Sequence, residues 1–210
     1  MILARVLRPA LQCSFFCVAL LLPFSDQLAR ADEQSFTPAG THTVGITVGP
    51  FFPIRLLQEQ SSKLFGVAAI PSWSITLTDP IGSSWYQGQI AVGAEVLALG
   101  TSQPVSATGI GVTPKLLYTL TNLGRLHPFM EGGGGPLWTD LGGRVPEQSG
   151  QYNFVVWAGA GFAWSLTHSL AIQAGYRFVH ISNAGTRSPN SGLNAGLPFV
   201  GLSYAFLSRR

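Results

Sequence analysis

A regular alternation of apolar with polar or small residues, sustained over long segments, constrains the fold of this chain more than any other feature. In the segment 169–182, every residue of one face is apolar over nine positions: Leu170, Ile172, Ala174, Tyr176 and Phe178. Successive side chains of a β-strand point to opposite faces, so this period predicts strands with one apolar face. Eight such segments are predicted: about 41–49, 63–78, 84–99, 107–121, 126–138, 153–166, 169–182 and 194–207.

The length of these segments and the scarcity of charge indicate a membrane setting. Soluble strands usually contain about 5–6 residues, whereas a tilted strand of about 9–11 residues crosses a bilayer. Charged residues make up only 10% of the chain, against about 25% in an average soluble domain. Beyond residue 25, no run of 18 apolar residues offers a spanning helix. We therefore predict an all-β fold, an eight-stranded antiparallel transmembrane β-barrel with lipid outside and a filled interior.

Residues 1–31 are predicted to be a cleaved signal peptide, which leaves 32–210 as a single outer-membrane β-barrel domain. Two arginines precede a short apolar stretch at 13–24, and Ala29-Arg30-Ala31 fits a cleavage site. The segment contains both cysteines of the chain, so the mature protein is expected to have no thiol and no disulfide.

The basic character of the chain also lies largely in this segment. It carries three of the 12 Lys and Arg residues and one of the nine acidic residues, so its removal lowers the net charge from +3 to about +1. Nucleic acid is therefore not an expected partner.

The C-terminal residues also indicate an outer-membrane barrel, and its strand number predicts the direction of each strand. Gly201, Tyr204 and Phe206 have the spacing of the final strand of outer-membrane barrels, although four residues follow the last aromatic. With an even number of strands and both termini in the periplasm, odd strands run outward and even strands return. The end of 169–182 and the start of 194–207 then meet at the outer leaflet.

His180 and Ser182 continue the apolar face of 169–182 at this point. Their spacing places them on one face of the strand, about 7 Å apart at Cα. A histidine can take the proton of a serine hydroxyl and so activate it as a nucleophile, provided that a third group orients the ring. Asn194, at the start of the next strand, could bond to the ring. The alternative is a pair of interfacial polar residues beside an ordinary hairpin loop with Asx turns.

Several motifs resemble the lipid A 3-O-deacylase (acyloxyacyl hydrolase) family of Gram-negative outer membranes. The main one is the run 175–185, with its core His180-Ile181-Ser182-Asn183-Ala184-Gly185, followed by Pro189-Asn190 and Gly192-Leu193. Residues 128–140 and 159–162 also resemble family segments. The similarity is strong over about 125–206 and weaker before. It implies an eight-stranded barrel that uses a lipid-facing Ser-His-Glu triad, and no cofactor, to remove the ester-linked acyl chain at the 3-position of lipid A.

The resemblance assigns roles to individual residues. Carried over by position, Ser182 would be the nucleophile and His180 the general base. The side chain of Asn183 and the backbone N–H of Gly185 would form the oxyanion hole, and Asn190 would support the loop.

The acid of the family's triad falls on Asn194, which cannot bear a negative charge. Asn194 either orients His180 as a neutral partner, as in Cys-His-Asn proteases, with slower turnover, or marks a weak or inactive homologue. The expected partner is lipid A or lipopolysaccharide of the outer leaflet, whose phosphates Arg187 could meet. A homodimer is left open by the sequence.

Two other classes of protein compete with the esterase. One is a non-enzymatic structural or small-solute outer-membrane barrel that kept the fold, and the other is a soluble periplasmic β-barrel that binds a lipid internally. No metal site is expected, since His42, His127 and His168 stand alone at strand ends. Inside the barrel, Glu95, Glu131 and Arg177 are expected to form an ion-pair cluster.

Overall fold

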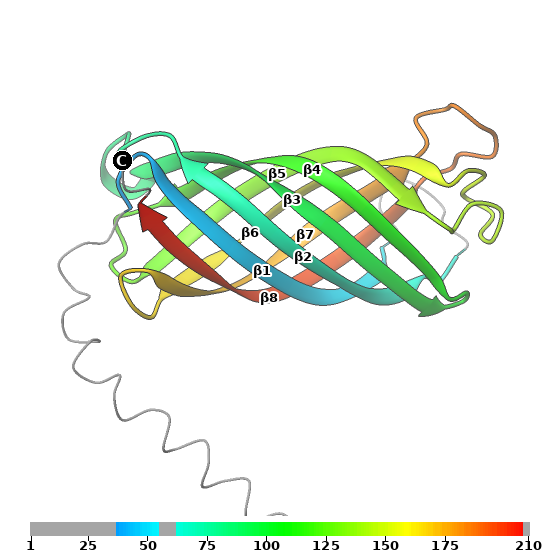
Figure 1. Ribbon diagram of the computed structural model, residues 1–210, viewed down its shortest axis with the longest axis horizontal. Coiled ribbons are helices and arrows are strands. Elements are labelled where there is room, and N and C mark those ends of the chain that lie inside the picture. Colours follow the sequence, from blue (N-terminus) through cyan, green and yellow to red (C-terminus); the bar gives the residue numbers. More distant parts are fainter. Residues whose placement is uncertain (1–36, 55–61, 208–210) are drawn as a thin grey trace, which may run out of the picture.

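A computed structural model describes residues 37–54 and 62–207 as a closed barrel of eight antiparallel strands (Figure 1). Each strand pairs with its neighbours in sequence, and the last pairs with the first. The predicted eight-stranded antiparallel β-barrel is confirmed. The strands are β1 (Thr41–Pro53), β2 (Phe65–Thr76), β3 (Gly88–Gln103), β4 (Ala107–Leu120), β5 (Leu126–Thr139), β6 (Tyr152–Ser165), β7 (Leu170–Ser182) and β8 (Leu193–Leu207).

The predicted segments match the strands to within a few residues, except around β3. The segment predicted to begin at residue 84 starts instead with a short 3-10 helix, η1 (Ser84–Tyr86), because Ser84 has a positive φ of 56° that no strand accommodates. At its other end β3 continues to Gln103, through residues predicted to separate strands, because Gln103 pairs with Phe65. The predicted signal peptide lies outside the described residues. None of the described residues forms a helix long and apolar enough to span a bilayer.

Both ends of the barrel chain lie at one end of the barrel, here called the termini end, where β1 begins and β8 ends (Figure 1). The odd strands run from it to the opposite end, here called the loop end. Two long loops, 140–151 and 183–192, lie at the loop end, together with the described residues 62–64 that precede β2.

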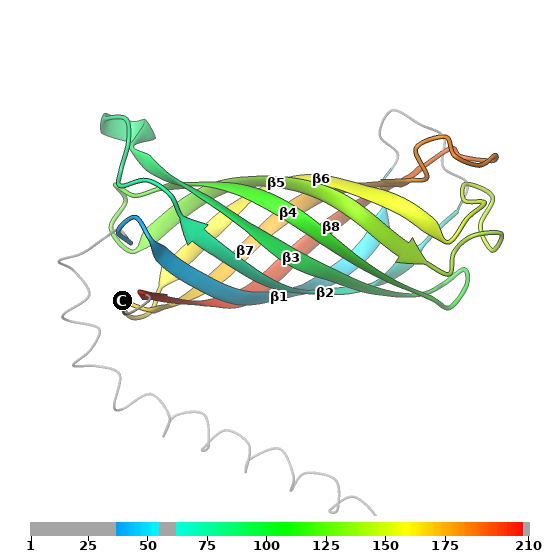
Figure 2. The same cartoon turned by 45° about the horizontal axis from the view of Figure 1, so that its top comes forward.

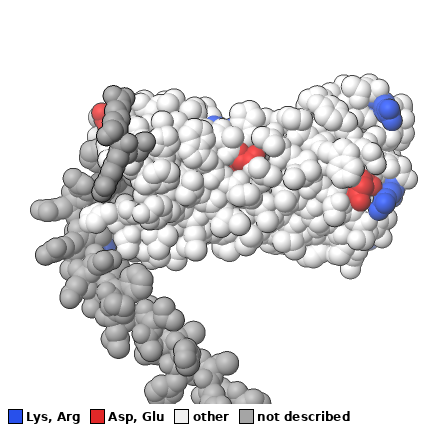
Figure 3. All heavy atoms as spheres, viewed as in Figure 1, with Lys and Arg blue, Asp and Glu red and all other residues white. Residues whose placement is uncertain are grey.

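The period-2 pattern separates an outer and an inner face on every strand. In β7, Ile172 and Tyr176 are exposed, whereas Arg177, Val179 and Ile181 are buried inside the barrel. Figure 3 shows a broad middle band almost free of charged side chains, with charges gathered mainly toward the two ends. Many large apolar side chains of the strands are exposed, among them Val67, Ile110, Leu116, Met130, Val156 and Val200. So much exposed apolar surface is unusual for a protein in water and suits the hydrocarbon of a membrane.

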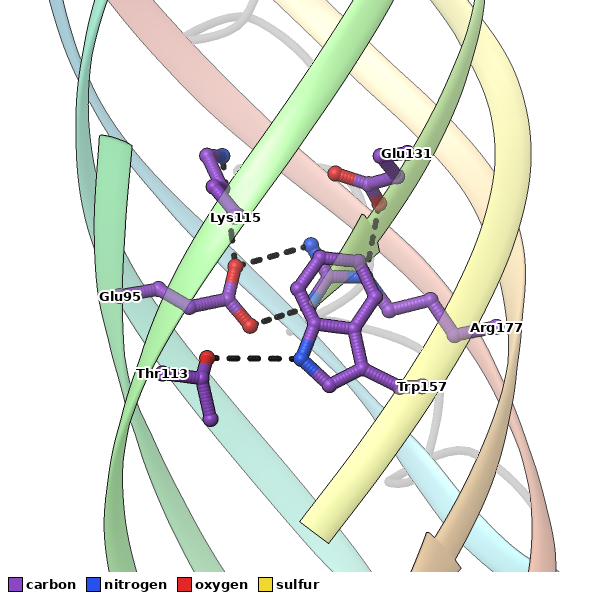
Figure 4. Close-up of polar contacts among 6 residues, drawn as sticks. All are labelled: Glu95, Thr113, Lys115, Glu131, Trp157 and Arg177. Carbon is purple, nitrogen blue, oxygen red and sulfur yellow. Dashed lines mark hydrogen bonds and ion pairs between the residues drawn. The ribbon is translucent and has the colours of Figure 1, made fainter. Parts of the chain in front are cut away.

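The interior is filled at mid-height by a buried charge network (Figure 4). Arg177 Nε lies 2.7 Å from Glu131 Oε1, and its two terminal nitrogens lie 2.8 and 3.1 Å from the carboxylate oxygens of Glu95. Lys115 Nζ approaches Glu95 at 4.0 Å, and the Arg177 guanidinium lies 4.0 Å from the ring centre of Trp157. The predicted cluster of Glu95, Glu131 and Arg177 is confirmed, and Lys115 and Trp157 join it.

Two glycines leave the room that this network needs. A Cβ on Gly133 would lie 2.8 Å from the Trp157 ring, and one on Gly159 would lie 2.8 Å from Arg177 Cγ. The glycine run at 132–135 thus serves close packing inside the barrel.

Candidate active site

His180 and Ser182 lie on the outer face of β7, next to the loop end. Their strand neighbours Val179 and Ile181 are buried inside the barrel, so the two polar side chains take the outward positions. Across the sheet, Ser182 pairs with Phe154 and His180 pairs with Val156, both on β6. The histidine and the serine therefore share the surface that faces lipid, as their spacing predicts.

Asn194 lies directly beside His180 on β8. The two residues are paired in the β7–β8 ladder, and His180 Nδ1 lies 2.7 Å from Asn194 Oδ1. An amide oxygen only accepts hydrogen bonds, so Nδ1–H is the donor and Nε2 keeps a free lone pair. Asn194 is only 5% exposed, so its side chain is held beside the ring by packing and is largely shielded from solvent.

Ser182 and His180 make no direct hydrogen bond in the described part of the chain. They are neighbours only because they are alternate residues on the same face of β7. Catalytic hydrogen bonds are often long in the absence of substrate and tighten in its complex. The arrangement therefore provides a hydroxyl and an imidazole whose Nε2 is the ring nitrogen that Asn194 does not contact.

The loop 183–192 is organised by the buried side chain of Asn183. Its Oδ1 accepts the N–H of Gly185 at 3.0 Å, and its Nδ2 donates to the carbonyl of Arg187 at 2.9 Å and to Ser149 Oγ at 3.3 Å. The N–H of Asn183 donates to Asn190 Oδ1 at 3.0 Å, which is the position expected of a residue that supports the loop.

Both groups proposed for the oxyanion hole are thus engaged inside the loop. The amide of Asn183 is directed to Arg187 and the N–H of Gly185 is directed to Asn183. Ala184 and Gly185 both have positive φ, 54° and 78°, which turns the chain tightly at this point. An oxyanion would have to replace the present acceptors of these two groups.

The neighbouring loop 140–151 supports the site in a way that the sequence did not predict. Gln148, 1% exposed, forms an isolated β-bridge with Asn190, and its Nε2 donates to the carbonyl of Ile181 at 3.2 Å. The carbonyl of Glu147 accepts from the N–H of Ser191 at 3.3 Å. The buried Glu147 carboxylate accepts from the N–H of Ser62 at 2.8 Å and from its hydroxyl, and so connects this loop with the residues that precede β2.

The loops near the site carry charges of both signs, and Arg144 pairs with Asp140 at 3.8 Å. Arg187 is exposed in the loop 183–192, and the side chain of Arg144, 51% exposed, lies in the neighbouring loop. Residues 37–54 and 62–207 contain no group of three or more His, Cys, Asp or Glu that could hold a metal ion.

Comparisons with known proteins bear on the family and the fold of the chain. The family model described as lipid A 3-O-deacylase (PagL) matches residues 66–206. The crystal structure of the outer membrane enzyme PagL is 20% identical, with 79% of this chain and 99% of that chain covered and a TM-score of 0.52. The crystal structure of Neisserial surface protein A (NspA) is 11% identical, with 81% and 100% covered and a TM-score of 0.53. A search of curated protein sequences finds no match.

Proposed function

Because this chain belongs to the lipid A 3-O-deacylase family of the Gram-negative outer membrane, we propose that it hydrolyses the ester-linked 3-hydroxyacyl chain at the 3-position of lipid A. In this proposal Ser182 is the nucleophile, His180 is the general base and Asn194 is the third member of the site. The observation that carries it is the 2.7 Å contact between His180 and Asn194, which orients the ring beside Ser182 on the lipid-facing surface.

The proposed reaction has two halves. Ser182 Oγ attacks the ester carbonyl carbon while His180 Nε2 takes the hydroxyl proton. The tetrahedral intermediate collapses, the bond to the sugar oxygen breaks, and His180 returns the proton to that oxygen. Water then attacks the acyl-enzyme with His180 again as base, which releases a 3-hydroxy fatty acid and restores Ser182.

Asn194 would act as a neutral orienting partner. Its oxygen fixes the tautomer in which Nδ1 is protonated and Nε2 can accept. It cannot stabilise the imidazolium with a full negative charge, so we expect slower turnover than a carboxylate would give.

The oxyanion hole would form when substrate arrives. The Asn183 amide and the Gly185 N–H are both at the start of the loop, close in sequence to Ser182. An oxyanion is a stronger acceptor than the Arg187 carbonyl or the Asn183 amide oxygen that these donors now use. We propose that the developing charge draws both donors out of their present bonds.

Arg187 and Arg144 would meet the phosphates of lipid A. Both lie in the loops that surround the site, and an arginine fork matches phosphate geometry. The acyl chains would then lie against the apolar outer face of β7 and β8.

The test is mass spectrometry of lipid A from a heterologous Gram-negative host that makes this protein, beside hosts that make Ser182→Ala or His180→Ala. The expected result is the loss of one hydroxyacyl mass with the wild type alone. Heat-modifiable electrophoretic mobility serves as the control that all three barrels are folded in the outer membrane. The N-terminus of the mature chain, measured in the same preparation, tests the proposed cleavage after Ala31.

Unchanged lipid A in the presence of folded wild-type barrel would contradict the proposal. Position 194 would then favour the second candidate, a barrel that kept the family fold without its chemistry. Full activity in both variants would contradict the assignment of Ser182 and His180.

A further inference from the structure

An apolar groove of about 810 Å³ lies on the outer wall of the barrel, far from the candidate active site. It is lined by residues from the termini-end halves of β4 to β7 together with η1. The main lining side chains are Trp85, Tyr86, Met130, Ala160, Phe162 and Ala174.

One wall of the groove is an arm formed by the β2–β3 connection. Figure 2 shows η1 standing out from the barrel at this end. The arm is held in place, since Tyr118 Oη donates to the carbonyl of Tyr86 at 2.5 Å and Asn122 Nδ2 donates to the carbonyl of Ser84. Trp85, at its tip, is 77% exposed.

The floor of the groove is built from small residues. Ala160 and Gly161 of β6 lie beside Ala174 and Gly175 of β7, while Phe162 stands at the side. None of the lining residues is charged. The volume falls within the range of about 300–1,000 Å³ that is typical of ligand pockets, which are mostly apolar and rich in aromatic side chains.

The location of the groove identifies the environment that fills it. Two of the three connections at the termini end, 121–125 and 166–169, are short, like the periplasmic turns of outer-membrane barrels, so the termini end faces the periplasm. The groove therefore opens to the inner leaflet, which consists of glycerophospholipids. Arg125 is the only Lys or Arg in the described connections of this end, at 37–40, 77–87, 121–125 and 166–169. It lies three residues after Asn122, which anchors the arm.

We infer that this groove is a binding site for one glycerophospholipid of the inner leaflet. One acyl chain lies on the small-residue floor against Trp85, and the anionic phosphate lies toward Arg125, since cations beside the membrane attract anionic headgroups. The Ser182 site is separate: Tyr176, at the rim of the groove, precedes Ser182 by six residues on β7, about 20 Å along the strand.

The test uses native mass spectrometry of the mature barrel in mild detergent, with 1-palmitoyl-2-oleoyl-phosphatidylglycerol as the probe. The wild type is expected to retain one phospholipid. Ala160→Trp fills the floor and is expected to weaken retention by at least about tenfold. The matched control is Ala69→Trp on β2, an outward position between the buried Ala68 and Ile70, which should bind as the wild type does.

Two further variants keep the test decisive. Trp85→Ala removes a wall without adding bulk, so it should also lose the phospholipid even if Ala160→Trp fails to fold. Arg125→Ala should weaken retention of phosphatidylglycerol by a smaller factor than Trp85→Ala.

Three results would overturn the inference. Equal retention by Ala160→Trp and Ala69→Trp would mean that the barrel holds only a general lipid annulus. If folded Trp85→Ala retains the phospholipid as well as the wild type does, the barrel likewise holds only a general lipid annulus. If the groove variants instead lose lipid A and its deacylation while phosphatidylglycerol binding is unaffected, the groove holds the distal part of the substrate.

Discussion

His180 Nδ1 and Asn194 Oδ1 lie 2.7 Å apart across the β7–β8 ladder, so a neutral amide occupies the place where the ring needs an orienting partner. The contact follows from strand register, because the two residues are directly paired and share the outer face. The short distance of this contact and the burial of Asn194 also determine how substitutions at residue 194 should affect activity.

Asn194→Asp keeps the length of the side chain and adds the charge that stabilises an imidazolium, so we expect it to raise kcat by about tenfold. Asn194→Glu adds a methylene to a 2.7 Å contact at a residue that is 5% exposed, so we expect it to lower kcat. The measurement is the initial rate of fatty-acid release from lipopolysaccharide in detergent micelles. A Glu variant faster than both Asn and Asp would mean that the wild type has lost its acid.

Asn190 is expected to act by holding the loop 183–192. Asn190→Ala removes the acceptor of the Asn183 N–H, a loss of about 1–3 kcal/mol, and we expect about tenfold less deacylation, mainly in kcat. Asn190→Asp keeps an acceptor oxygen at the same distance and should retain most of the activity. Equal activity of the two variants would remove Asn190 from the site.

Gly185→Ala is predicted to lower activity through backbone strain alone. No atom lies within 4 Å of the Cβ it would add, but its φ is +78°, which costs roughly 1 kcal/mol for a residue with a side chain. Gly143→Ala is the matched control, with φ +74° and equally open space in the neighbouring loop. Both variants should lose similar stability, and only Gly185→Ala should lose deacylation. A similar loss of deacylation in Gly143→Ala would contradict a specific role for Gly185.

The buried ion-pair network around Arg177 is predicted to contribute more to the free energy of unfolding than ion pairs on the surface do. Arg177→Ala leaves Glu95 and Glu131 buried without their main cation, so we expect a loss of about 3–5 kcal/mol in the free energy of unfolding. Arg144→Ala breaks a surface pair with Asp140 and should change stability by only about 0–1 kcal/mol. Urea unfolding in lipid vesicles measures both, and equal losses would contradict the network's role.

The parts of this protein that repeat with period 2 could be predicted from sequence. The alternation predicts the barrel, the shared outward face of His180 and Ser182, and the inward cluster around Arg177, and the structure has all three. Chain direction and strand order then placed Asn194 next to His180.

The missed features depend on contacts that have no local signal. Gln148 and Glu147 contact the loop 183–192 from a segment that in sequence only separates two strands. The aromatic run that forms η1 has high strand propensity, yet the positive φ of Gly82 and Ser84 turns it out of the sheet. Such conformations are determined by tertiary packing rather than by pattern.

The outward position of Ser182 has a kinetic consequence. In the proposed reaction, the Ser182 hydroxyl on the lipid-facing wall would meet its substrate by lateral diffusion within one leaflet, without a soluble encounter. The rate of the proposed reaction would then depend on the mole fraction of lipid A in that leaflet. The released fatty acid enters the same two-dimensional phase, so each turnover dilutes the substrate around the barrel and slows the next.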